Sequence, residues 1–232
     1  MLHEYVKHAA AAAARFTGSA PSRIAAVLIS VVAVLAPAQV AAAAPDYDGI
    51  YPNDRYRPKC ADLGGNPTSA ATVCLTDNSD LWYYADSSGF GKLEDLDKLK
   101  LGEMLYNQYD PTDLKVQYDY SPVFSGGGET DIVYQEDSKD LDGAIGVAWC
   151  NDRVNGNDWR CDQTYVRIKG HGYYQENGVT CHETGHVVGL LHGFNTDPEI
   201  HYQDSRLGCM VTGMMPPGSL GSNNRQFINE VY

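Results

Sequence analysis

The sequence predicts an α/β fold in which a twisted, mixed five-stranded sheet packs against two main helices. Five short segments are rich in β-branched and aromatic residues and are bounded by Gly, Asn, Asp and Ser, as strands and their turns commonly are. Two longer segments have helical patterns, one after the first strand and one after the last. Strands and helices that alternate in this way indicate an α/β arrangement.

Each expected strand contains Val, Ile, Thr, Tyr or Trp, the residue types enriched in sheets. The five segments are residues 81–84, 115–120, 130–134, 143–149 and 164–168.

The two expected helices begin and end at recognisable signals. Residues 92–109 place leucines and a methionine near helical spacing, and the Asp-Pro pair at 110–111 stops this helix. The second helix is expected over residues 177–189 and ends at a glycine. The C-terminal part is expected to be irregular, apart from a last short helix around residues 227–231.

Residues 1–44 have the pattern of an export signal. Basic residues precede a short apolar run at 24–35, and small residues that suit a signal peptidase follow it. An uncleaved membrane anchor is the alternative, but the run is shorter than the roughly 20 apolar residues that a spanning helix needs. We therefore expect a secreted, extracellular chain that begins near residues 43–45 and has no membrane contact.

The chain is acidic, which limits its partners. Its formal net charge is −13, and loss of residues 1–44 would lower it to −15. Phosphate binding needs clustered Lys and Arg, which are absent, so nucleic acid and anionic membranes are not expected partners. The remaining length suits one domain, and we expect a monomer.

Six cysteines in an exported chain favour three disulfide bonds. Fifteen connectivities are open, and we favour the local or neighbouring pairs 60–74, 150–161 and 181–209. A cysteine-ligated zinc site is the alternative, but no pair has the CxxC spacing. The six residues are Cys60, Cys74, Cys150, Cys161, Cys181 and Cys209.

The segment TCHETGHVVGLLHG at 180–193 contains the pattern HExxHxxGxxH. On a helix, His182 and His186 lie on one face about one turn apart, where two imidazoles can bind one ion. A third ligand cannot reach that ion if the helix continues. Gly189 permits the left-handed turn that would end the helix, and His192 could then swing back as the third ligand.

Three nitrogen ligands would leave one tetrahedral position of a zinc ion for water and substrate. Glu183 projects beside the first ligand and could accept a proton from the water. The pattern therefore predicts hydrolysis with no covalent intermediate, and no GxSxG motif suggests a serine nucleophile.

In this pattern the chain resembles the metzincin clan of zinc endopeptidases, whose motif is followed by a methionine turn. The resemblance implies that the three histidines bind zinc and that Glu183 is the general base. In the segment GCMVTGMM, Met210 is our choice for the turn and Met214 the runner-up. It also implies a zincin-like fold, with the active-site helix followed by an irregular C-terminal subdomain.

The implied protein is a secreted metalloendopeptidase acting on protein or peptide substrates. Residues 45–80 would form an N-terminal extension with a disulfide loop, and residues 81–232 the metzincin-like catalytic domain. Substrate would pair with an edge strand at 143–149, and residues 216–218 would wall a side-chain pocket. The alternative is a catalytically silent or single-target zinc-binding protein, such as an adhesin or toxin.

Three departures qualify the resemblance. HETGHVVGL is similar to the snapalysin type of small neutral protease, but those have Asp as third ligand where this chain has His192. Thr212 stands where astacin-like and serralysin-like members have a tyrosine, so that extra ligand is not expected. The segment RPKCAD at 57–62 resembles the matrixin cysteine switch in a different residue order, and a disulfide at Cys60 is the favoured interpretation.

Two Asp-rich stretches, residues 135–142 and 151–162, carry the oxygen ligands that calcium prefers. Neither matches an EF-hand loop. Solvated loops are the favoured interpretation, and a structural Ca²⁺ ion is the alternative.

Overall fold

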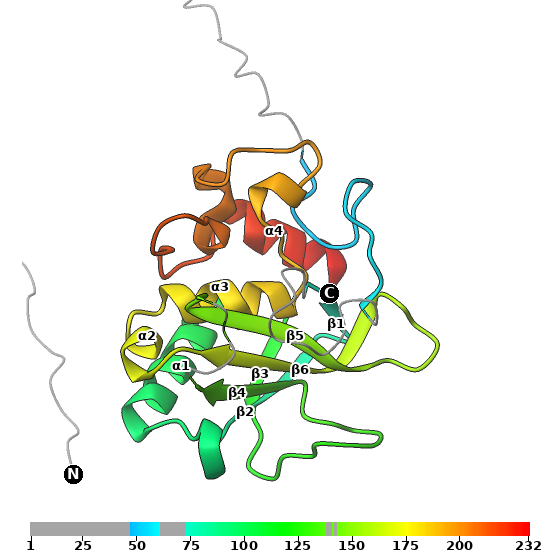
Figure 1. Ribbon diagram of the computed structural model, residues 1–232. Helices are drawn as coiled ribbons and strands as arrows, with labels where there is room; N and C mark the ends of the chain where they lie inside the picture. The colour runs from blue at the N-terminus through cyan, green and yellow to red at the C-terminus, as the bar shows by residue number, and fades with distance from the viewer. Residues whose placement is uncertain (1–46, 61–72, 138–140, 142) are drawn as a thin grey trace, which may run out of the picture. The chain divides into compact units, whose positions relative to one another are not determined.

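A computed structural model describes residues 47–60, 73–137, 141 and 143–232 (Figure 1). All of them belong to one compact unit, residues 44–232. The export signal expected at 1–44 lies outside the described residues, as does part of the acidic stretch 135–142.

The core of the fold is a mixed six-stranded sheet. Central β6 pairs in parallel with β4 and, near its start, with β1, while β2 pairs in parallel with both β4 and β3. Only β5 is antiparallel, on β6. The strands are β1 (Leu75–Thr76), β2 (Asp80–Ala85), β3 (Lys115–Tyr118), β4 (Ile132–Glu136), β5 (Gly146–Arg153) and β6 (Arg160–Ile168).

The predicted mixed sheet is confirmed, but the count of five strands was wrong. All five expected segments are strands, with ends shifted by a few residues, and β1 is the addition. It was missed because two residues are too few to show the alternation that marks a strand.

Strand β5 lies at an edge of the sheet. Among the described residues it pairs with β6 alone, with Val147 opposite Arg167 and Trp149 opposite Tyr165. Helix α3 (Gly178–Val187) packs chiefly against β5 and runs alongside it (Figure 1).

The other helices are α1 (Asp95–Gln108), α2 (His171–Gln175) and α4 (Ser222–Val231). The first begins three residues later than expected, and its side chains Leu96 and Leu99 are about half exposed instead of buried. Helix α2 was not expected, whereas α4 confirms the last short helix. No helix in the described ranges is long and apolar enough to cross a membrane.

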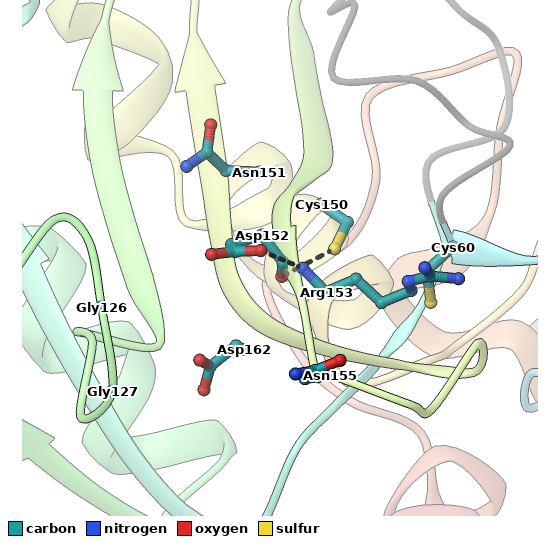
Figure 2. Close-up of a pocket in the computed structure, with 9 residues that line it drawn as sticks. All are labelled: Cys60, Gly126, Gly127, Cys150, Asn151, Asp152, Arg153, Asn155 and Asp162. Atoms are coloured by element: carbon teal, nitrogen blue, oxygen red, sulfur yellow. Dashed lines mark hydrogen bonds between the residues drawn. The ribbon is translucent and has the colours of Figure 1, made fainter.

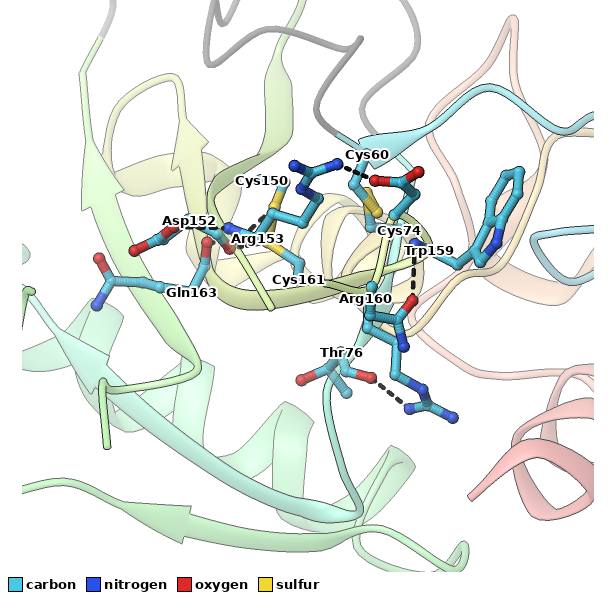
Figure 3. The surroundings of a disulfide bond; sticks show 12 residues. Cys60, Cys74, Thr76, Cys150, Asp152, Arg153, Trp159, Arg160, Cys161 and Gln163 are labelled. Atoms are coloured by element: carbon cyan, nitrogen blue, oxygen red, sulfur yellow. Dashed lines mark hydrogen bonds and ion pairs between the residues drawn. A yellow bond between two sulfur atoms is a disulfide. The ribbon is translucent and has the colours of Figure 1, made fainter. Parts of the chain in front are cut away.

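The six cysteines lie in the three favoured pairs, at disulfide distance. The Cα–Cα distances are 5.7 Å for 60–74, 5.7 Å for 150–161 and 6.0 Å for 181–209. The first pair ties the N-terminal segment to the start of β1, and the second ties β5 to β6 (Figure 3). Since Cys60 is paired, it offers no free thiolate for a cysteine switch.

Candidate metal centre

Helix α3 holds the first two histidines of the pattern in a buried position. Every residue of this ten-residue helix is buried. Because His182 and His186 are four residues apart, their rings lie one turn apart on one face, with centroids 4.8 Å from each other. The helix is buried on all sides because it packs between β5 and the C-terminal part of the chain. This burial explains why its sequence has no amphipathic pattern.

The third histidine returns to these two through a left-handed turn. Gly189 follows the helix with φ of 91°, a value that favours glycine, and a Cβ there would stand 2.5 Å from Leu75 Cδ2. The chain then brings His192 Nε2 to 2.9 Å from His182 Nε2 and 3.0 Å from His186 Nε2. The three residues singled out from the sequence are thus brought together.

The hydrogen bonds of two rings decide which nitrogens face the centre. His182 Nδ1 lies 2.8 Å from the carbonyl oxygen of Cys209, and His186 Nδ1 lies 3.0 Å from that of Leu190. A carbonyl only accepts, so each Nδ1 carries the proton and each Nε2 presents a lone pair. Within the described residues, His192 Nδ1 has no such partner.

Burial keeps the histidines in the form that binds metal. It lowers the pKa of His182 to about 4 and that of His192 to about 3, and it holds the pKa of His186 well below its usual value. All three rings are therefore neutral at pH 7. The Nε2 lone pairs of His182 and His186 both face His192 Nε2, which can meet them with its proton or can join them with a third lone pair on a shared cation.

The spacing fits a metal ion. Metal–nitrogen bonds of 2.0–2.1 Å at tetrahedral angles place ligand nitrogens roughly 3.3 Å apart, a few tenths of an ångström more than the distances of 2.9 and 3.0 Å found here. Imidazole suits several transition metals, among them zinc, copper, iron and nickel. Among the described residues, this is the one group of three or more His, Cys, Asp or Glu side chains close enough to share an ion.

Glu183 lies next to the cluster, against strand β5. Its side chain is buried, and a Cβ at Gly146 would stand 2.6 Å from Glu183 Oε1. Burial raises the pKa of Glu183 to about 8. A cation bound by the neighbouring histidines would oppose this shift and favour the carboxylate, which is the form that accepts a proton. The glycine in β5 leaves the space that the carboxyl occupies, which the sequence alone did not indicate.

Met210 packs against helix α3 at Gly185. It is fully buried, and a Cβ at Gly185 would stand 2.3 Å from Met210 Sδ. The preceding Cys209 is bonded to Cys181 of the helix. The runner-up, Met214, is 59% exposed. The geometry favours Met210 as the side chain that supports the helix.

A hollow of about 280 Å³ opens beside the cluster. Glu183, His182 and Val179 of α3 form one wall, and the approach to β5 from Gly143 forms another. Of the segment expected to wall a pocket, Pro216 lines the hollow, whereas Pro217 and Gly218 are not among its lining residues. The remaining lining residues are Ala144, Ile145, Gly146, Val211, Thr212, Gly213 and Met214.

A larger hollow of about 630 Å³ shares no lining residue with the histidine cluster (Figure 2). Five residues of the acidic stretch 151–162 line it: Asn151, Asp152, Arg153, Asn155 and Asp162. No three carboxylates come as close together there as the histidine nitrogens do, within the described part of the chain. Calcium binding by this stretch stays a prediction.

No protein-family model and no curated protein matches the chain. The interpretation of the site therefore depends on its residues and their geometry.

Proposed function

We propose that the chain is a secreted zinc-dependent endopeptidase of the metzincin type, with a zincin-like fold. The observation that carries the proposal is the convergence of three histidine Nε2 atoms beside a buried glutamate. His182, His186 and His192 are the proposed ligands, Glu183 the general base and Met210 the methionine turn. Three disulfide pairs favour an oxidising compartment outside the cell.

A zinc ion held by the three histidines would polarise the scissile carbonyl and lower the pKa of a water molecule to about 7. The protein's own residues would transfer the protons and hold the ligands in place. Glu183 accepts the proton of the attacking water and returns it to the nitrogen of the leaving amine. The hydrogen bonds from the Nδ1 atoms of His182 and His186 fix their ring orientation throughout.

Strand β5 is the proposed docking edge for substrate. It has an unpaired edge within the described part of the sheet, and it lies along the helix that carries Glu183. An extended peptide can add to such an edge through backbone hydrogen bonds. The hollow of about 280 Å³ beside Glu183 would then receive one substrate side chain, and its valine, isoleucine and methionine walls favour an apolar one.

The test is hydrolysis of casein by the purified chain and by two glutamate variants. Glu183→Gln keeps the shape of the side chain but cannot take the proton, whereas exposed Glu176→Gln is the matched control. We expect the parent and the control to cleave casein. A chelator should abolish this cleavage, and added zinc should restore it. A parent that contains zinc but leaves casein intact would favour a dedicated target or a silent zinc-binding protein, and equal activity of Glu183→Gln would refute the assigned base.

A further inference from the structure

A segment of the expected N-terminal extension lies against the part of the chain that carries the third histidine. We call residues 47–56 the strap and residues 189–197 the third-ligand loop. Two antiparallel bridges join them, although more than a hundred residues separate them in the sequence (Figure 1, strap in blue). An extension that only preceded the domain would not make such contacts.

Backbone hydrogen bonds secure the first half of the third-ligand loop. The amide of Tyr51 donates to the carbonyl of Gly189 at 2.7 Å, and the amide of Leu191 donates to the carbonyl of Gly49 at 2.9 Å. These two bonds fix the left-handed turn and the residue just before the third histidine.

Further bonds secure the loop beyond His192. Asp48 and Asp197 exchange backbone hydrogen bonds of 2.6 and 3.0 Å. The side chain of Asn53, which is 2% exposed, donates from Nδ2 to the carbonyl of Asn195 at 3.0 Å. The strap thus holds the loop on both sides of the ligand.

Side-chain packing and a covalent bond fix the strap itself. Ile50 and Tyr51 are buried, and Ile50 Cγ1 lies 3.2 Å from where a Cβ of Gly189 would be. A few residues beyond the strap, Cys60 is bonded to Cys74 at the start of β1. Through Tyr47, Ile50 and Tyr51, the strap therefore contributes to the hydrophobic core of the domain.

We infer that the strap is a positioning element of the metal centre, which keeps His192 within reach of the ion. The other two ligands have a helix and a hydrogen bond at Nδ1 to orient them. His192 depends on its loop, which the strap holds together with hydrogen bonds from Ile200 and Thr196 to the carbonyl of Gly193. The inference rests on the proposed metal site. It implies that proteolytic cleavage within the strap weakens metal binding even though every ligand remains in the chain.

The test is zinc affinity, measured by competition with a chromophoric chelator. Asn53→Asp keeps the oxygen that accepts from the amides of Arg55 and Tyr56 and removes the donor to Asn195. We expect affinity to fall about tenfold, as for other groups that orient ligands. Ile50→Ala, which unpacks the strap without new charge, should weaken binding in the same direction.

Val116→Ala is the control. It shortens a buried side chain in β3, at the end of the sheet, and leaves the contacts between the strap and the third-ligand loop intact. Its zinc affinity should stay within about twofold of the parent despite lower stability. Affinities of both strap variants within twofold of the parent would overturn the inference. Zinc binding by the parent without casein cleavage would refute only the proposed protease activity, whereas a parent without zinc would overturn both proposals.

Discussion

Substitution of Gly185 by alanine tests how tightly helix α3 is packed on the segment below it. A Cβ at this position would stand 2.3 Å from Met210 Sδ and 3.5 Å from Leu190 Cδ1, both in fully buried side chains. Alanine in a helix interior is favoured over glycine by roughly 0.5–1 kcal/mol, whereas overpacking a core costs about 1–3 kcal/mol. Because the contact is far inside van der Waals distance, we expect a net loss of about 1–2 kcal/mol.

The energy of this contact is measured by urea unfolding of four proteins: the parent, Gly185→Ala, Met210→Ala and the double variant. Met210→Ala alone should cost about 2–5 kcal/mol through the cavity it leaves. Gly185→Ala added to that variant should cost nothing further, since the methyl group enters the vacated space. The reasoning is refuted if Gly185→Ala is as stable as the parent, or if its penalty persists in the Met210→Ala background.

Three further predictions concern the base, a disulfide and a buried carboxyl. Gly146→Ala should lower hydrolytic activity about tenfold or more at unchanged metal content, because its Cβ displaces the carboxyl of Glu183. Replacing Cys181 and Cys209 together by alanine should lower the free energy of unfolding by about 3–4 kcal/mol, measured in urea. Burial raises the pKa of Asp131 to about 8, so the folded state keeps a proton that the unfolded state loses near pH 4, and stability falls as pH rises between these values. Asp131→Asn should therefore stabilise the protein more at pH 8 than at pH 4, and an equal effect at both would contradict this.

The strands and helices were predictable where a segment carried its own pattern. All five expected strands are present. They could be predicted because β-branched and aromatic residues between turn signals form a pattern that is visible in the local sequence alone. Helix α1 was found by its leucines, but spacing did not reveal that Leu96 and Leu99 face solvent. Strand β1 and helix α2 are too short for a pattern to form.

The cluster of three histidines was predictable because one short sequence pattern contains all of them. Its surroundings were not. The carbonyls of Leu190 and Cys209 that orient two rings are backbone groups, which leave no signature in the sequence. The space for Glu183 depends on Gly146, and the strap depends on contacts between distant segments. Such features are set by long-range packing and become visible only in three dimensions.

Metal content after dialysis in a zinc buffer tests the central claim most directly. The measurement compares the parent with His192→Ala and with His201→Ala, the second being an exposed histidine outside the cluster. We predict one zinc ion per chain in the parent and in His201→Ala, and almost none in His192→Ala. A parent without zinc, or zinc retained in full by His192→Ala, would contradict the assignment of the three histidines as the metal centre.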